Sequence, residues 1–296
     1  MNYCLKSKYV VSTIIGFTLS VFSSFSLALE LPLDDNVPGG IAIIQLNETG
    51  DIAPKVHYNK KPVMVVRHQQ AWHALIGIPL AAKAGEHSVR SEHGGKNHNY
   101  TFQVSDKQYE TQHLTIKNKR KVNPNPDDMK RIGKEKKKIS TALAHWDDNL
   151  YTDTLQLDLP VQGRLSSPFG LKRFFNEQPR KPHSGIDIAA PKGTPIKTPA
   201  GGKVILTGDF FFNGNSVFID HGQGLITMYC HMDNIQVKDG QLIKQGEQIG
   251  TIGMTGRVTG PHLHWSISMN NARIDPNLIV PALRQTAQTD PTTPSM

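Results

Sequence analysis

Five side chains in the C-terminal half of the chain have the types and spacing of a metal site. His183 and Asp187 lie four residues apart, His262 and His264 lie two apart, and His231 lies between these pairs. On an extended strand, residues separated by two or four positions project their side chains from the same face. Imidazole and carboxylate groups from two neighbouring strands can therefore converge on one point.

The available donors favour zinc. The chain has 13 His and only 2 Cys, so a metal site must rest on imidazole and carboxylate groups rather than thiolates. Gly185 leaves space between the donors of the first pair. Zinc with three protein ligands keeps one position open for water, lowers the pKa of that water to about 7 and polarises a carbonyl group. Because no HExxH helix motif is present, we expect a hydrolytic zinc site built on strands.

Catalysis at such a site also needs groups that exchange protons. No Glu lies close to these His in the sequence, so imidazole is the natural candidate. The spacing alone does not decide which of His262 and His264 binds the metal. The other one, together with His231, would serve the proton transfers.

The elements around these residues are predicted to be strands. Hydrophobic residues make up 38% and charged residues 20% of the chain, which excludes a disordered or collagen-like protein, and no P-loop or dinucleotide-binding motif is present. Strand-like runs bounded by Gly occur at residues 201–206, 216–220, 225–230, 248–252 and 264–268. We therefore expect an antiparallel β-sheet domain that carries this metal site over residues 151–283, followed by a flexible polar tail over 284–296.

An ordered series of motifs over residues 160–277 resembles the lysostaphin-type (LytM-like) zinc metallopeptidases that cut peptidoglycan. The motifs are Phe169-Gly170, His183–Pro195, Ile219–Gly222, Tyr229–His231, Val237–Gly240 and Gly253–His264. The resemblance implies one zinc ion (Zn2+) per chain with His183, Asp187 and His264 as its ligands. It implies His231 and His262 as the catalytic pair, and peptide cross-links of bacterial peptidoglycan as the substrate.

Some relatives of this fold have lost their ligands and activate amidases instead. A non-catalytic wall-binding regulator is therefore the alternative, although all five site positions are present here. Cys230 stands where Ala is common before the catalytic His, and a buried neutral thiol is a small hydrophobic group there. Tyr229 either hydrogen-bonds near the oxyanion or packs in the core. His221 is interpreted as structural.

The first half of the mature chain is predicted to be a second β domain. Short β-type runs occur at residues 41–46, 63–67, 74–78, 98–104 and 113–117, separated by turn signals. This spacing predicts a small antiparallel β-sandwich-like domain over residues 29–117. The segments Pro38–Ile44 and Ile76–Leu80 resemble the N-terminal domain that some members of the family carry.

A basic connector over residues 118–150 is expected to join the two domains. Ten Lys and Arg lie between Lys117 and Lys138, and Asp127-Asp128 after a Pro-rich break is typical of a helix start; we expect that helix to run to about Asn149. Such a run could contact nucleic acid, but the aromatic side chains needed for base stacking are missing. A solvated connecting helix, and no nucleic-acid partner, is the prediction.

Residues 1–28 read as an export signal. Lys6 and Lys8 precede an apolar stretch, and Ser26-Leu27-Ala28 ends in small residues suited to cleavage. An uncleaved membrane anchor is the other reading of this stretch. After cleavage we expect no stable membrane span, a location in the periplasm or outside the cell, and a net charge that stays positive and suits anionic wall polymer. The expected fold is mostly β throughout.

Overall fold

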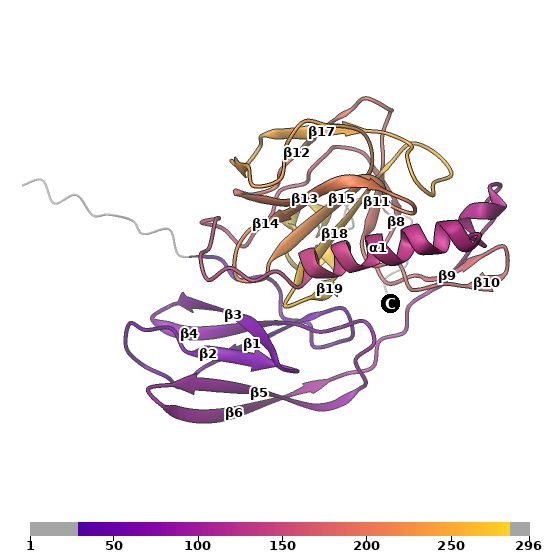
Figure 1. The fold of residues 1–296 in the computed structure, drawn as a ribbon. Helices are drawn as coiled ribbons and strands as arrows, with labels where there is room; N and C mark the ends of the chain where they lie inside the picture. The colour runs from indigo at the N-terminus through magenta and orange to yellow at the C-terminus, as the bar shows by residue number, and fades with distance from the viewer. Residues whose placement is uncertain (1–28, 285–296) are drawn as a thin grey trace, which may run out of the picture.

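A computed structural model describes residues 29–284 (Figure 1). The predicted signal peptide at 1–28 and the predicted tail beyond residue 284 lie outside the described residues. The fold is mostly β, as expected from the spacing of the strand-like runs. Within residues 29–284, the structure contains no helix that combines the length and the apolarity needed to cross a membrane.

The N-terminal part is one six-stranded antiparallel sheet in the order β1-β4-β3-β2-β5-β6. Its strands are β1 (Ile41–Gln45), β2 (Lys55–Tyr58), β3 (Lys61–His68), β4 (Ala71–Gly77), β5 (Gly85–His93) and β6 (Lys96–Val104). Val65 and Ile76 from one half of the sheet share a buried core with Val89 and Phe102 from the other half, so the sheet curls over itself like a small sandwich. The sequence reading missed β2 and β5, which are rich in polar residues.

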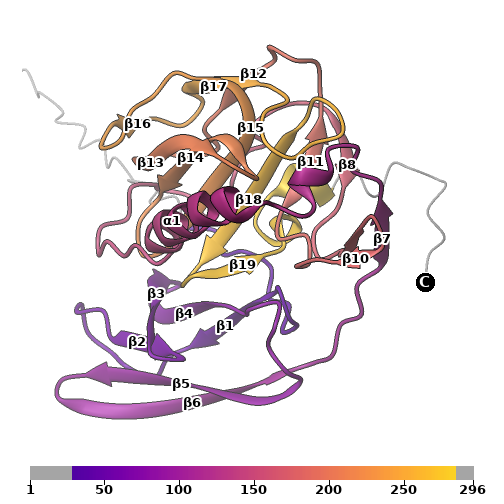
Figure 2. The same ribbon diagram turned by 45° about the vertical axis from the view of Figure 1, so that its right-hand side comes forward.

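Strand β7 (Thr111–Leu114) does not belong to this sheet. It pairs in parallel with β9 (Lys172–Phe175), which in turn pairs with β10 (Gln178–Pro179). The prediction had grouped residues 113–117 with the N-terminal strands. The chain instead leaves the N-terminal sheet after Val104 and crosses to the C-terminal part (Figure 2).

The connector contains the 3₁₀ helix η1 (Lys119–Lys121) and the helix α1 (Pro126–Leu143). Asn125 caps α1 in a reciprocal capping box with Asp128, as the acidic start predicted. The helix ends at Leu143 and not near residue 149. Beyond it, Asp147 forms a local turn by accepting hydrogen bonds from Asn149, a side-chain pattern that competes with helix. Its last turns pack against the C-terminal sheet, on the side of β13 (Figure 1).

The C-terminal part is a ten-stranded antiparallel sheet with the central order β16-β13-β14-β15-β18-β11-β8. Its strands are β8 (Arg164–Ser167), β11 (Ile186–Ala189), β12 (Pro195–Lys197), β13 (Gly202–Phe210), β14 (Gly214–Asp220), β15 (Ile226–Ile235), β16 (Leu242–Ile243), β17 (Gln248–Ile252), β18 (Leu263–Met269) and β19 (Ala272–Ile274). The 3₁₀ helix η2 (Pro276–Leu278) follows β19. The core under β18 contains the fully buried Leu263, Trp265 and Ile267, which alternate with the residues of the opposite face.

The two parts pack directly against each other. Met64 and Leu75 of the N-terminal sheet belong to the same buried cluster as Ile267 and Met269 of β18. At this contact the Asn270 side chain accepts a hydrogen bond from the Gly77 N–H at 2.7 Å and donates one to the Gly77 carbonyl at 3.0 Å. The N-terminal sheet is therefore joined to the turn that links β18 and β19.

Replacing Asn270 by Ala should lower the free energy of unfolding by about 1–3 kcal/mol, because both polar groups of Gly77 would lose their buried partner. Urea denaturation followed by fluorescence measures this loss. Asn271→Ala is the matched control, since Asn271 shares the left-handed backbone of the turn (φ 61° against 42°) but does not bond Gly77. Equal losses in the two variants would contradict the assigned role of the amide pair.

Candidate metal centre

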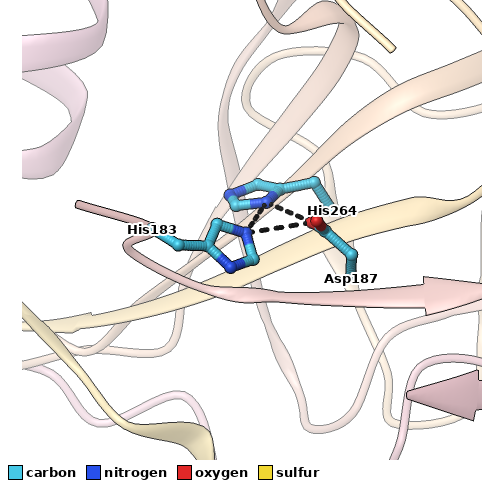
Figure 3. Close-up of side chains that lie close together, drawn as sticks. All are labelled: His183, Asp187 and His264. Atoms are coloured by element: carbon cyan, nitrogen blue, oxygen red, sulfur yellow. Dashed lines mark hydrogen bonds and ion pairs between the residues drawn. The ribbon is translucent and has the colours of Figure 1, made fainter. Parts of the chain in front are cut away.

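Three potential ligand atoms from His183, Asp187 and His264 meet at one point (Figure 3). The Oδ1 atom of Asp187 lies 2.8 Å from Nδ1 of His264 and 3.0 Å from Nε2 of His183, and these two nitrogens are 3.0 Å apart. Donors about 2.1 Å from a tetrahedral zinc ion lie roughly 3.4 Å from one another. A small opening of this cluster would accommodate such an ion, and His264 rather than His262 completes the set.

Strand pairing brings two of the three donors together. Asp187 on β11 lies opposite His264 on β18 in the antiparallel register, as the prediction of two neighbouring strands required. His183, however, is not on the strand, because β11 begins only at Ile186. Its position comes from a loop, in which the His183 N–H donates to the Leu171 carbonyl and the His183 carbonyl accepts from Gly170.

Gly185 is the point of closest approach between this loop and β18. A Cβ atom at Gly185 would lie 2.4 Å from the Trp265 carbonyl oxygen and 3.0 Å from Cε1 of His264. Any larger residue would push the loop, and with it His183, away from the sheet. The absence of a side chain at Gly185, which the sequence suggested as space between the donors, is therefore needed for the backbone of this loop to approach β18.

Hydrogen bonds to backbone carbonyls determine which ring nitrogen carries the proton in three of the histidines. Each of these imidazoles donates its Nδ1–H to a carbonyl oxygen: His183 to Pro168 at 2.7 Å, His231 to Thr255 at 2.9 Å and His262 to Gly260 at 2.8 Å. A carbonyl oxygen can only accept, so the neutral ring keeps its lone pair on Nε2. In His183 that Nε2 faces Asp187 and His264.

The carboxylate of Asp187 is buried, and both of its oxygens have polar partners. Burial alone would raise its pKa, but the close approach of the His183 and His264 imidazoles outweighs burial and brings the pKa well below its usual value. Its second oxygen, Oδ2, accepts a hydrogen bond from Nη2 of Arg173 at 2.8 Å. Asp187 is therefore held as a charged acceptor, as a metal ligand has to be.

A β-bulge presents His231 to this cluster. In the pairing of β14 with β15, Cys230 and His231 stand opposite the single residue Ser216. His231 has a left-handed backbone (φ 64°), and its N–H bonds the Asn213 carbonyl. A non-glycine residue in this conformation costs roughly 1–3 kcal/mol, which the surrounding structure must offset.

The rings of His231 and His262 lie next to each other beside the three donors. Their centroids are 4.9 Å apart, and Nε2 of His262 is 3.9 Å from Oδ1 of Asp187. Burial, followed by the proximity of His262 and His264, lowers the pKa of His231 to about 3. All five predicted site residues are thus brought together, three with mutually contacting donor atoms and two alongside.

The two residues before His231 pack in the interior. Tyr229 is fully buried and its hydroxyl receives a hydrogen bond from Thr227 at 3.0 Å, so of the two readings offered by the sequence the structure shows the packing one. Burial raises the pKa of the Cys230 thiol to about 12. Cys230 is therefore a neutral core residue and does not join the three donor atoms.

A second group of possible donors lies after α1, where His145, Asp147 and Asp220 come together. Both oxygens of Asp147 are already hydrogen-bonded, one to Asn149 and the other to Tyr151. His145 lies 3.4 Å from Asp220. This group is accounted for as a close contact between His145 and Asp220 beside a hydrogen-bonded turn.

Sequence reasoning missed the groups that orient four of the five side chains. Arg173 carries no motif that marks it as a partner of Asp187, because it lies fourteen positions earlier in the sequence, on another strand. The carbonyls of Pro168, Thr255 and Gly260 have no residue-specific signal at all. Only the folded loops show that these groups face the imidazoles.

Both halves of the chain match known protein families. The models of Peptidase family M23 and of the Peptidase family M23 N-terminal domain match residues 181–276 and 34–107. A crystal structure of a Pseudomonas aeruginosa protein assigned to peptidase M23 is 44% identical with a TM-score of 0.72, and the match covers 84% of this chain and 96% of that one.

Two curated relatives match less than half of this chain. Peptidoglycan DD-endopeptidase ShyA of Vibrio cholerae serotype O1 is 42% identical over 136 residues, which are 43% of this chain and 32% of that protein. DD-carboxypeptidase/endopeptidase Mpg of Neisseria meningitidis serogroup B is 40% identical over 116 residues, 39% of this chain and 27% of that protein. The matches therefore span less than a third of the length of these relatives.

Buried imidazoles should make the metal-free protein sensitive to acid. His221 is fully buried between the Gly201 carbonyl and the Thr227 hydroxyl, and burial lowers its pKa to about 4; burial likewise lowers the pKa of His264 to about 4. Between the unfolded pKa near 6.5 and these values the unfolded state binds more protons. The free energy of unfolding should therefore fall as the pH falls from 6.5 to 4, by up to about 1.4 kcal/mol per pH unit for each imidazole.

Urea titrations of chelator-treated protein between pH 7 and pH 4 measure this slope. His221→Gln should reduce it, because that variant lacks one of the buried titrating groups. The control is His57→Gln, since His57 is exposed on β2, and its slope should equal that of the wild type. A stability that does not change over this pH range would contradict neutral burial of these imidazoles.

Proposed function

The chain belongs to peptidase family M23, and from that premise we propose that it is a zinc-dependent metalloendopeptidase that hydrolyses peptide cross-links of bacterial peptidoglycan. The observation that carries the proposal is the meeting of three donor atoms from His183, Asp187 and His264 with two further imidazoles beside them. Hydrolysis at a metal needs both parts, since the ligands hold the ion and the remaining groups move protons.

The donor set fits zinc. Two imidazole nitrogens and one carboxylate oxygen are a common ligand set for a catalytic zinc ion with an open position. The Nδ1–H of His183 is tied to the Pro168 carbonyl and Asp187 is tied to Arg173, which is the supporting shell typical of metal ligands. When bound, zinc would activate a water molecule and polarise the scissile carbonyl group.

His231 and His262 would supply the proton transfers. Each imidazole holds its proton on Nδ1 against a backbone carbonyl, which leaves Nε2 able to accept a proton or a hydrogen bond. The low pKa of His231 keeps this ring neutral at physiological pH. The same Nε2 atoms could later deliver a proton to the leaving amine, because an imidazole that accepts a proton can also return it.

The substrate assignment is supported by the relatives. ShyA and Mpg are named as endopeptidases, and ShyA is named for peptidoglycan. An enzyme acting on that polymer has to reach the cell envelope, which agrees with reading residues 1–28 as an export signal. The site of action would be the periplasm or the cell exterior.

Variants of three of the five residues should distinguish metal binding from proton transfer. His264→Ala should lose bound zinc and all activity. His262→Ala and His231→Asn should keep zinc but release muropeptides from isolated sacculi about 100- to 10,000-fold more slowly. Asn is chosen at 231 because it tolerates the left-handed backbone. Bound zinc is measured by elemental analysis and muropeptides by mass spectrometry, which also identifies the bond that is cut.

The exposed His57→Ala variant is the control and should match the wild type in both measurements. Wild-type protein that binds zinc yet releases no muropeptides, while stimulating an amidase on the same sacculi, would replace the proposal by the regulator alternative. Wild-type release rates in both His264→Ala and His262→Ala would refute the site assignment.

A further inference from the structure

A hydrogen-bonded chain of side chains connects strand β7 with the candidate metal ligand Asp187. Nε of Arg173 donates to Oε1 of Gln112 at 3.2 Å, and Nη2 of Arg173 donates to Oδ2 of Asp187 at 2.8 Å. The same Nη2 also donates to Oγ of Ser167 at 2.8 Å. The side chains of Arg173 and Asp187 are only 15% and 11% exposed, so this is a largely desolvated ion pair.

The two oxygens of Asp187 have separate partners in this arrangement. Oδ1 faces His183 and His264, whereas Oδ2 is taken by Arg173. A carboxylate held in this way offers one oxygen to a cation and cannot rotate freely about its terminal bond. Fixing a ligand before the metal arrives is the usual means by which a supporting group raises metal affinity.

Gln112 brings a distant part of the chain into this arrangement. It lies on β7, which follows the N-terminal sheet and pairs with β9, the strand that carries Arg173. Both residues lie in the interval between the two segments that the family models match, 34–107 and 181–276. The next residue on β7, His113, stacks on Phe174 at 4.8 Å and pairs with Glu177, so it contacts β9 without touching Arg173.

We propose that Arg173 is a positioning residue for the metal ligand Asp187 and that Gln112 positions Arg173, so that the seating of β7 on β9 sets the metal affinity. This inference rests on the proposed function, because it concerns the same metal centre. The positive charge of Arg173 disfavours the binding of a nearby cation, whereas the orientation that Arg173 gives to Asp187 favours that binding. Orientation dominates, because Oδ1 is the oxygen directed at both imidazoles and Arg173 bonds only the other one.

The test uses the full chain with Arg173→Gln, Gln112→Ala, Gln112→Glu and His113→Ala. Zinc affinity is measured by competition with a chromophoric chelator, and kcat and KM are measured on a soluble cross-linked muropeptide. Arg173→Gln should weaken zinc binding about 10- to 100-fold, the usual effect of losing a group that orients a ligand. Gln112→Ala should weaken it less, in the same direction, and lower kcat at zinc concentrations below saturation with KM unchanged.

Two variants separate the Gln112 bond from the packing of β7. Gln112→Glu keeps an acceptor for Nε of Arg173 and should restore part of the affinity lost in Gln112→Ala. His113→Ala removes the stacking on the other side of β7 and should bind zinc as the wild type does. If Arg173→Gln does not fold, Arg173→Lys replaces it and should show an intermediate loss, since Lys keeps the charge but not the planar fork.

Unchanged or tighter zinc binding in both Arg173→Gln and Gln112→Ala overturns the inference. A loss in His113→Ala equal to that in Gln112→Ala overturns the part assigned to Gln112. Failure of the proposed function would look different, because the wild-type protein itself would then bind no zinc or release no muropeptides.

Discussion

A buried carboxylate has to be paired, and Asp187 is the group around which the pairs of this protein are arranged. Burial opposes its charge, while His264 and Arg173 each donate a hydrogen bond to it and Nε2 of His183 lies 3.0 Å from it. Removing one of these partners would leave a charged group in the interior with an unmet acceptor, which is far more costly than losing a surface bond. The strands and loops that deliver the three partners must therefore come to the same place, namely β9, β11, β18 and the loop that holds His183.

The scaffold fulfils this requirement with backbone geometry. The register of β11 with β18 sets Asp187 opposite His264, the lack of a side chain at Gly185 lets the preceding loop approach β18, and the bulge on β15 directs His231 toward the same point. Carbonyl oxygens then select the nitrogen that keeps a lone pair in three of the imidazoles. The strained backbone at His231 lies beside the cluster, where such conformations are usually found when they serve chemistry.

The parts of the chain outside the C-terminal sheet are not independent of this centre. The N-terminal sheet shares a buried cluster with β18 and is fixed to the turn after it by Asn270. Further along the chain, β7 lies against the hairpin that carries Arg173, and Lys121 of the connector lies over the ring of Phe211, close to the turn whose Asn213 carbonyl binds His231. Displacement of β7 or of the connector would therefore disturb the hairpin that carries Arg173 and the residues next to the turn that holds His231.

The sequence by itself determined the β character of both parts, the capped start of α1 and the five side chains of the centre. The first two depend on local signals, namely alternation along a strand and a capping residue. The five side chains stood out as closely spaced donor residues within an ordered series of motifs. The spacing left the choice between His262 and His264 open, and the structure brings His264 to the donors, as the family resemblance implied. Only the tertiary structure decided that His183 comes from a loop and that β7 crosses to β9. Only the structure showed that Arg173 donates a hydrogen bond to Asp187 and that Tyr229 is buried in the core. These features depend on strand register, on a bulge and on unmarked carbonyl groups, and such contacts between distant segments leave no periodic trace in the residues that make them.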